Sequence, residues 1–264
     1  MLRCNRVGGM MNGNRMRIAT WNVNHRVGRT TFRPEAAHAA CALDADLICL
    51  NEFYPKSEEE SFRRVLFESG YCHQLISPAA PSGVHANRVL IASRKPIEQV
   101  DLQVPTHEPH LRTNVLGVRT DEITLVGMRV PAYDRLEAAH LLAAWEWASD
   151  LAARLCEQPA VILGDLNVSL KSLGYQKGRH LQAILANGWT RVATVGATYH
   201  GHNGVRSEID HVLVTRQCRA THPVVLTTIG EFSLCGQANS ISDHAVLMCD
   251  LESVPVLSSP EVSE

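Results

Sequence analysis

Short runs of apolar residues recur along most of the chain, and each is bounded by polar residues, glycine or proline. The runs are four to eight residues long and rich in Val, Ile and Leu, which is typical of buried strands. They predict strands at residues 17–22, 45–50, 71–76, 88–93, 97–104, 114–119, 123–130, 160–163, 209–215, 223–228 and 245–251.

Four other segments have the features of helices. They lie at residues 34–43, 57–69, 136–156 and 180–186. The second opens with Ser57 and Glu60 in the spacing of a capping box, and Gly70 stops it. The third is the longest and carries apolar residues nearly all round, including Trp145 and Trp147, so we expect it to be well buried.

The order of these elements predicts the fold class. Strands outnumber helices, several strands are joined by hairpin-length links, and helices follow the first and second strands and return in the middle of the chain. This order is typical of two packed mixed sheets with helices outside them. We therefore predict an α+β protein, a four-layer αββα sandwich.

Polar side chains occur at the ends of several apolar runs. Acids and amides rarely lie beside buried strands unless another group compensates for their desolvation, as a divalent metal and a phosphate would together. The segments are Thr20-Trp21-Asn22-Val23-Asn24, Leu50-Asn51-Glu52, Gly164-Asp165-Leu166-Asn167, Glu208-Ile209-Asp210-His211 and Ser242-Asp243-His244.

Composition limits the class of protein. The chain has 264 residues, of which 45% are hydrophobic, enough for a sizeable core. The net charge of −2 lowers the odds of tight, non-specific binding to duplex DNA, although a local basic groove remains compatible with it. None of the eight cysteines forms a CxxC pair, so no zinc site is expected. Cys41, Cys49 and Cys249 lie in apolar runs and are expected to be buried free thiols.

The motifs extend over nearly the whole chain, which predicts one domain at residues 16–252. Residues 1–15 are rich in Gly, Asn, Arg and Met and are expected to be a flexible lead, with Met16 a possible biological start. Residues 253–264 are expected to be a disordered tail. We see no signal peptide and no membrane span, so we expect a cytoplasmic protein with reduced cysteines. We also expect a monomer and infer no obligate protein partner.

In their order and content the five motifs resemble the endonuclease/exonuclease/phosphatase superfamily, which includes DNase I, exonuclease III, sphingomyelinases and inositol polyphosphate 5-phosphatases. The resemblance covers roughly residues 16–252 and implies the same αββα fold. It also implies a phosphoester hydrolase that depends on Mg²⁺, with Mn²⁺ as a substitute. Glu52 would be the principal metal ligand, Asn22 would help to organise metal and phosphate, and Asp243 would be a further acid beside the metal.

The resemblance also implies the catalytic residues. Asp165 would orient or deprotonate the attacking water, and Asn167 would hydrogen-bond the phosphate, which are the two parts that an in-line displacement needs. Asp210 would pair with His244, which would donate to the scissile phosphate. A carboxylate on one imidazole nitrogen holds the ring in one tautomer and raises its basicity.

Three further residues are candidates for phosphate contacts, each with an alternative. Arg129 precedes a Val-Pro pair and could bind phosphate in a bidentate manner, or be a surface charge at a strand end. Asn24 stands where nucleases often have Asp, or is a turn residue. His200 lies where many nucleases have an aromatic loop, or is an exposed loop histidine. The chain departs from the family's usual residues at Asn51, normally Gln, and around Asp210, where it has Glu208 and His211.

Several substrates remain open, because one fold hosts many functions. A nuclease that cleaves nucleic acid is our first hypothesis. The short interval between Asp165 and Asp210 lacks the inserts with which exonuclease III-type enzymes grip damaged DNA, which argues against a dedicated abasic-site enzyme. The alternative is a phosphatase or phosphodiesterase for inositol phosphates, phospholipid head groups or small nucleotides. A non-enzymatic binding module is the third possibility.

Overall fold

A computed structural model describes residues 15–24, 34–54, 57–79, 87–132, 138–172, 176–201 and 203–254. The predicted lead at 1–15 lies outside the described residues except for Arg15, and most of the predicted tail at 253–264 lies outside them as well. Among the described residues no helix is both long enough and apolar enough to cross a membrane.

The first large sheet has six strands in the order β13-β16-β1-β2-β4-β3. β1 pairs in parallel with β2 and antiparallel with β16, so the carboxyl ends of β1 and β2 lie at the same edge. Its strands are β1 (Met16–Asn22), β2 (Leu47–Phe53), β3 (His73–Ile76), β4 (Arg88–Ser93), β13 (Cys218–Leu226) and β16 (Val246–Ser253).

The second large sheet also has six strands, in the order β5-β6-β7-β8-β12-β9. β7 and β8 are parallel, and β12 runs antiparallel to β8. Its strands are β5 (Glu98–Val100), β6 (Val115–Thr120), β7 (Ile123–Met128), β8 (Ala160–Asp165), β9 (Trp189–Arg191) and β12 (Asp210–Thr215). Two small hairpins complete the strands: β10 (Tyr199–His200) with β11 (Arg206–Ser207), and β14 (Thr228–Ile229) with β15 (Phe232–Ser233).

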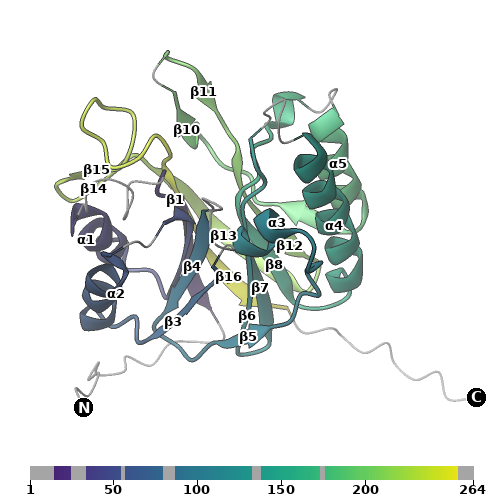
Figure 1. Cartoon of the computed structure of the whole chain (residues 1–264), viewed down its shortest axis with the longest axis horizontal. Helices are drawn as coiled ribbons and strands as arrows, with labels where there is room; N and C mark the ends of the chain where they lie inside the picture. Colours follow the sequence, from purple (N-terminus) through teal and green to yellow (C-terminus); the bar gives the residue numbers. More distant parts are fainter. Residues whose placement is uncertain are drawn as a thin grey trace, which may run out of the picture.

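Helices cover the outer faces of the two large sheets. Figure 1 shows α1 and α2 on one side of the molecule, α4 and α5 on the other, and the two sheets between them. The predicted four-layer αββα arrangement is therefore confirmed. Among the described residues the helices are α1 (Pro34–Ala42), α2 (Glu59–Glu68), α3 (Pro109–Thr113), α4 (Ala138–Leu155) and α5 (Gln176–Ala186), and η1 (Leu170–Ser172) is a 3₁₀ turn.

Three clusters of buried side chains hold these layers together. One lies between the sheets and includes Cys49, Ile91 and Leu163. The second packs α1 and α2 against the first sheet, and the third packs α4 and α5 against the second sheet. Trp145 and Trp147 of α4 are both buried in the third cluster, as the apolar composition of this helix predicts.

Some local predictions are wrong. The capping box does not form: helix α2 has Glu58 at its N-cap position without a side-chain cap, and the hydroxyl of Ser57 donates to the Glu58 carboxylate instead. The strand predicted at 97–104 ends at Val100, and Gln103 has a positive φ of 56°. Helix α3 was missed because five residues are too few to show a helical period. Cys41 is only partly buried, whereas Cys49 and Cys249 are buried, and all three are free thiols.

Candidate active site

Motif residues from both sheets meet at one edge of the sandwich. Asn22 ends β1 opposite Asn51 of β2, and Glu52 follows Asn51 in the same strand. In the second sheet Asp165, the last residue of β8, stands directly opposite Asp210, the first residue of β12. The two strand ends meet across the sheets, because Asn22 Nδ2 donates to Asp165 Oδ2 at 2.8 Å. The candidate site therefore lies where the strand ends of the two sheets come together.

Asp210 and His244 form a buried pair. His244 Nδ1 lies 2.8 Å from Asp210 Oδ2, and both side chains are almost completely buried. Since a carboxylate accepts, Nδ1 carries the hydrogen and Nε2 is the ring nitrogen left for a substrate. Burial alone lowers the pKa of His244, but the negative charge of Asp210, followed by those of Asp165 and Asp243, outweighs burial and raises the pKa to about 10.

Asp165 is almost completely buried in the site. Its Oδ2 accepts from Asn22 Nδ2 at 2.8 Å and from Asn167 Nδ2 at 2.9 Å, and its Oδ1 accepts from the Asn167 backbone N–H at 3.0 Å. Burial raises the pKa of Asp165 to about 7, although His244 and Arg129 act in the opposite direction. Near neutral pH this carboxyl group can therefore exist with and without a proton.

Arg129 lies inside the site and is not a surface charge. Its Nε is 2.7 Å from Glu52 Oε1, an ion pair that does not have the alignment of a hydrogen bond, and 3.9 Å from Asp165 Oδ2. The side chain is only 14% exposed. Arg129 thus supplies a positive charge between two carboxylates, where an anionic group of a substrate would also be stabilised.

The amides of the site hold protein groups. Asn167 Nδ2 donates both to Asp165 and to Val130 O, at 2.8 Å, which uses its two hydrogens. A bond from Asn167 to phosphate, which the resemblance implies, would require one of these to break. Asn22 Oδ1 accepts from the Asn24 backbone N–H at 2.8 Å, and Asn24 has a positive φ of 52°. Asn24 therefore has the geometry of a turn residue.

Asp243 and His200 lie beside this cluster. Asp243 Oδ1 is 3.9 Å from His244 Nε2 and has no hydrogen-bond partner in the described part of the chain. The backbone N–H of His200, in β10, donates to Asp243 O at 2.8 Å, so the β10–β11 hairpin is attached directly to the motif. His200 and Asp243 both line a pocket between this hairpin and the segment before β16.

Two motif residues without a role assigned from the sequence, Trp21 and Ser242, hold the motifs together. Ser242 Oγ donates to Asn22 O at 2.7 Å and accepts from the His244 backbone N–H at 3.0 Å. Trp21 Nε1 donates to His244 O at 3.0 Å. These bonds join β1 to the segment that carries His244, which gives a structural reason for the serine and the tryptophan in the two motifs.

Two residues at which the chain departs from the family's usual pattern support Asp165. Asn51 Oδ1 accepts from the Asp165 backbone N–H at 3.2 Å and so connects the two sheets beneath the site. His211 is fully buried, and its Nε2 lies 2.7 Å from Val168 O, in the loop that follows Asp165. Because a carbonyl only accepts, Nε2 of His211 carries the hydrogen; burial lowers the pKa of this imidazole.

Gly164 allows the sheets to come this close. Its φ is +143°, and a Cβ at this position would lie 2.0 Å from Met128 O and 2.7 Å from Asn51 Oδ1. Any side chain would push β7 and Asn51 away from β8. The glycine of Gly-Asp-Leu-Asn is therefore required by the packing immediately before Asp165.

The donor atoms of the site suit a hard divalent cation. Carboxylate oxygens of Asp165 and Asp210 lie within 4.8 Å of each other and of a ring nitrogen of His244. With a pKa of about 10 the His244 ring is protonated, so the carboxylates are the atoms available to a cation. Asp210 Oδ1 and Asp243 Oδ1 are buried acceptors that lack a hydrogen-bond partner within the described residues, which a cation or its bound waters would satisfy. This group differs from the set implied by the resemblance, in which Glu52, Asn22 and Asp243 are the metal residues.

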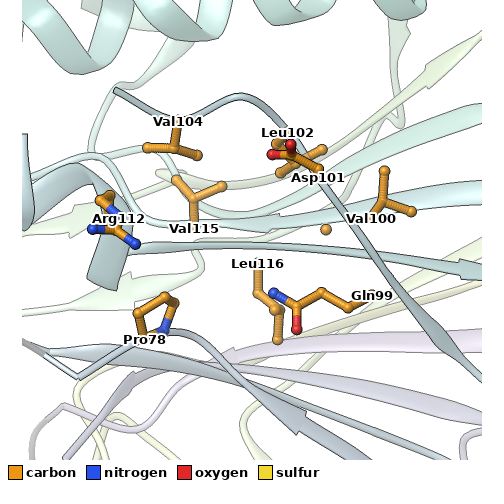
Figure 2. Close-up of a pocket in the computed structure, with 10 residues that line it drawn as sticks. Pro78, Gln99, Val100, Asp101, Leu102, Val104, Arg112, Val115 and Leu116 are labelled. Carbon is orange, nitrogen blue, oxygen red and sulfur yellow. The ribbon is translucent and has the colours of Figure 1, made fainter. Parts of the chain in front are cut away.

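A separate cavity of about 390 Å³ lies on the β5–β6 side of the second sheet. Figure 2 shows Arg112 and Pro78 towards one end of it, Gln99 and Val100 towards the other, and the side chain of Val104 above that of Val115. None of the candidate site residues lines this cavity, so it is not part of the catalytic cluster.

The chain matches the Endonuclease/Exonuclease/phosphatase family over residues 19–244 and belongs to that family. The family's name covers enzymes that hydrolyse phosphoesters, so the chain is assigned to hydrolases of the nuclease and phosphatase type. No curated protein sequence matches the chain significantly.

Solved structures share the fold. An endonuclease/exonuclease/phosphatase from Beutenbergia cavernae is 18% identical with a TM-score of 0.68, and the match covers 91% of this chain and 72% of that one. The 3′ phosphatase NExo from Neisseria, bound to a product DNA hairpin, is 16% identical with a TM-score of 0.67, covering 89% and 98%. An AP endonuclease from Archaeoglobus fulgidus is 20% identical with a TM-score of 0.62, covering 89% and 98%.

Proposed function

We propose that this protein is a divalent-metal-dependent phosphoester hydrolase and that it acts as a nuclease on phosphodiester bonds of nucleic acid. The observation that carries the proposal is the buried cluster of Asp165, Asp210 and His244 at the strand ends. In this cluster Asp165 offers a carboxylate that can hold a water molecule. The neighbouring imidazole of His244 is hydrogen-bonded to a second carboxylate, that of Asp210. That combination suits displacement at phosphorus.

In the proposed mechanism Asp165 holds the attacking water and takes its proton as the water oxygen bonds to phosphorus. Asn22 and Asn167 hold the Asp165 carboxylate in place through their amide hydrogens. His244 donates from Nε2 to a phosphate oxygen, while Asp210 keeps the ring in the required orientation. Arg129 places positive charge beside the phosphate, and the bond to the leaving oxygen breaks opposite the water.

Glu52 is the proposed principal ligand of Mg²⁺ or Mn²⁺, with Asn22 and Asp243 contributing to the site. The oxygen-rich donor set suits either ion. When bound, the cation polarises the phosphate and stabilises negative charge on the leaving oxygen.

Nucleic acid is the proposed substrate because the chain belongs to a family named for endonucleases and exonucleases. Of the structural neighbours, one is a 3′ phosphatase bound to a product DNA hairpin and another is named an AP endonuclease. A monomer that acts in the cytoplasm, as predicted from the sequence, belongs to the same proposal. Light scattering of the purified protein and cell fractionation test these two points.

The first test is hydrolysis of bis(4-nitrophenyl) phosphate with and without Mg²⁺ or Mn²⁺. No turnover with either ion would favour the binding module over the enzyme. A panel of DNA, RNA, cyclic nucleotides and inositol phosphates then identifies the substrate, and a preference for inositol phosphates would replace the nuclease proposal with its alternative.

The second test is Glu52→Gln, which should preserve the fold and remove most of the metal-dependent turnover. A titration of turnover with Mg²⁺ measures the apparent metal affinity. We expect the affinity to fall because the carboxylate charge is lost. An apparent affinity equal to that of the wild type would show that Glu52 is not the principal ligand.

A further inference from the structure

The Arg129 guanidinium contacts the carboxylate that we propose as the principal metal ligand. Arg129 Nε lies 2.7 Å from Glu52 Oε1, and the two side chains are only 14% and 10% exposed. Little water can therefore screen the guanidinium from a second cation placed on Glu52, and two like charges at one buried carboxylate repel each other. The contact between Arg129 and Glu52 and the binding of a divalent cation to Glu52 thus oppose each other.

The backbone of β2 holds Glu52 in this position. Between Leu50 and Phe53 the register of β2 against β4 shifts, so that Asn51 and Glu52 stand against a single residue of β4, Val89. This arrangement is a β-bulge, a feature that redirects side chains beside active sites. Glu52 also has a φ of +54°, in the left-handed region that residues other than glycine rarely adopt. The place of the carboxylate is therefore set by its own strand.

The backbone of Arg129 is fixed, whereas its side chain can exchange partners. The Arg129 N–H donates to Asn114 O at 2.8 Å, and the N–H of the next residue, Val130, donates to Asp165 O at 2.9 Å. Arg129 Nε has no aligned hydrogen-bond acceptor within the described residues, although Glu52 is close to it. Moving the guanidinium away from Glu52 therefore breaks a contact between charges but no hydrogen bond of Nε.

Arg129 supplies the positive charge that two carboxylates need. Its Nε is also 3.9 Å from Asp165 Oδ2, while the other positive group of the cluster, the His244 ring, is hydrogen-bonded to Asp210. Among the described residues Arg129 is thus the cation beside Glu52 and Asp165. A divalent cation would bring twice that charge to the cluster, and the guanidinium would then have an incoming phosphate as its strongest partner.

We propose that Arg129 competes with the divalent cation for the Glu52 carboxylate, so that the arginine weakens metal binding and the bound cation releases the arginine toward the phosphate. The proposal rests on the metal-dependent function proposed above. By reciprocity, the cation weakens the contact of Arg129 with Glu52 by the same factor by which that contact weakens the binding of the cation. Arg129 thereby turns to the substrate when the site has its metal.

The experiment measures Mn²⁺ binding to the purified full-length protein without substrate, from the electron paramagnetic resonance signal of free Mn²⁺. Arg129→Met removes the charge and keeps an unbranched side chain. We expect its Kd for Mn²⁺ to be at least about tenfold lower than that of the wild type, which is roughly the effect of a unit charge on a divalent ion a few ångströms away in bulk water. A Kd equal to or higher than that of the wild type would overturn the proposal.

Two variants control for charge. Arg129→Lys keeps the positive charge, so its Kd should lie closer to that of the wild type than to that of Arg129→Met. Arg112→Met is the matched control, because Arg112 is exposed on α3, two residues before the Asn114 carbonyl that binds the Arg129 backbone. Its Kd should equal that of the wild type. A fall as large as that of Arg129→Met would show that net charge, rather than contact with Glu52, is the cause, and the proposal would be wrong.

Glu52→Gln separates competition for one carboxylate from general repulsion between cations. In the Glu52→Gln protein Arg129 has no carboxylate to give up at this position, so adding Arg129→Met should lower the Kd by a smaller factor than it does in the wild type. An equal factor in the two backgrounds would show that Arg129 acts on the metal by repulsion alone and would refute the competition.

Nuclear magnetic resonance of the wild type tests the proposal even if Arg129→Met does not fold. The Arg129 Nε–H resonance is identified by its loss in Arg129→Lys. Mg²⁺ should increase the exchange of this hydrogen with water as the side chain leaves Glu52, and unchanged or slower exchange would contradict the proposal.

The outcomes distinguish this proposal from the proposed function. If the wild type binds Mn²⁺ but Arg129→Met binds it no more tightly, only the competition fails. If Arg129→Met binds Mn²⁺ and the wild type does not, the competition is supported and the metal-dependent function of the wild type fails. If none of the proteins binds Mn²⁺, both fail.

Discussion

His211 offers the sharpest test of how the tertiary structure supports the site. Its Nε2–H donates to the carbonyl oxygen of Val168 at 2.7 Å, three residues after Asp165. Both His211 and Val168 are buried, so water cannot replace the bond if the imidazole is removed. His211→Leu should therefore loosen the loop that carries Asp165 and Asn167.

The size of the effect follows from the two buried groups. Leaving the Val168 carbonyl without a donor costs about 1–3 kcal/mol of unfolding free energy. The leucine also removes His211 Nδ1, a buried atom with no hydrogen-bond partner in the described structure, which offsets part of that cost. We expect a net loss of about 1–2 kcal/mol. A displacement of Asp165 of about 1 Å would lower kcat by roughly 10²-fold.

His211→Gln is the matched control, because its amide carries an N–H donor at a similar distance from the backbone. Urea denaturation measures stability, and hydrolysis of methyl 4-nitrophenyl phosphate at saturating metal measures kcat and KM separately. We expect His211→Leu to lower kcat with little change in KM, and His211→Gln to recover most of the loss. Equal kcat values for the leucine and glutamine variants would refute the idea that the hydrogen bond to Val168 positions the loop.

Three further predictions concern the dyad, the thiols and acid stability. His244→Ala should lower turnover about 10²–10⁴-fold. If Asp210 acts by orienting His244, the variant with both Asp210→Ala and His244→Ala should be little less active than His244→Ala alone. If the losses of the two single variants multiply and Asp210→Ala also shifts the metal affinity, Asp210 is an independent metal ligand. Mass spectrometry under non-reducing conditions should find eight free thiols, and a defined disulfide would contradict this. Burial raises the pKa of Asp250, but hydrogen bonds from Arg15 and Arg17 outweigh it and lower the pKa below 3.8. The stability that this group contributes is therefore complete above about pH 5 and lost as the pH falls through the folded pKa. Measured by urea denaturation, Asp250→Asn should lower the free energy of unfolding by about 1 kcal/mol at pH 7 and should not change it at a pH below the pKa of Asp250 in the folded protein. An equal loss of stability at the two pH values would show that the charge of Asp250 is not the cause.

Much of the fold could be predicted because a strand that is buried in the protein requires a run of apolar side chains in the sequence. The strands that form the centre of both sheets were predicted to within a few residues, including β1, β2, β8 and β12. Their ends were less accurate: β2 continues through Asn51 and Glu52 to Phe53, and β8 continues to Asp165. A sheet extends as far as backbone partners exist, whereas a hydrophobic pattern ends at the last apolar side chain.

The shortest elements could not be predicted for the same reason. Strands β9, β10, β11, β14 and β15 have two or three residues each, too few to show alternation. The capping box at Ser57 failed because the helix begins at Glu59 with Glu58 at its N-cap, which leaves Ser57 outside the cap position. Local sequence motifs indicate which bonds are possible, and the position of the helix in the fold decides which ones form.

The amino-acid sequence by itself determined the layer order, the family and the set of polar residues at the strand ends. Buried strands and helices appear in the sequence as runs or repeats of apolar residues, and each motif is a short contiguous segment, so both can be recognised without the structure. Only the tertiary structure decided the partners of those residues. It brought Arg129 to Glu52, gave both amide hydrogens of Asn167 to protein acceptors, and placed His200 beside Asp243 in a pocket. These contacts join segments whose spacing in the chain carries no information about their distance in space, since that distance is set by how the two sheets pack.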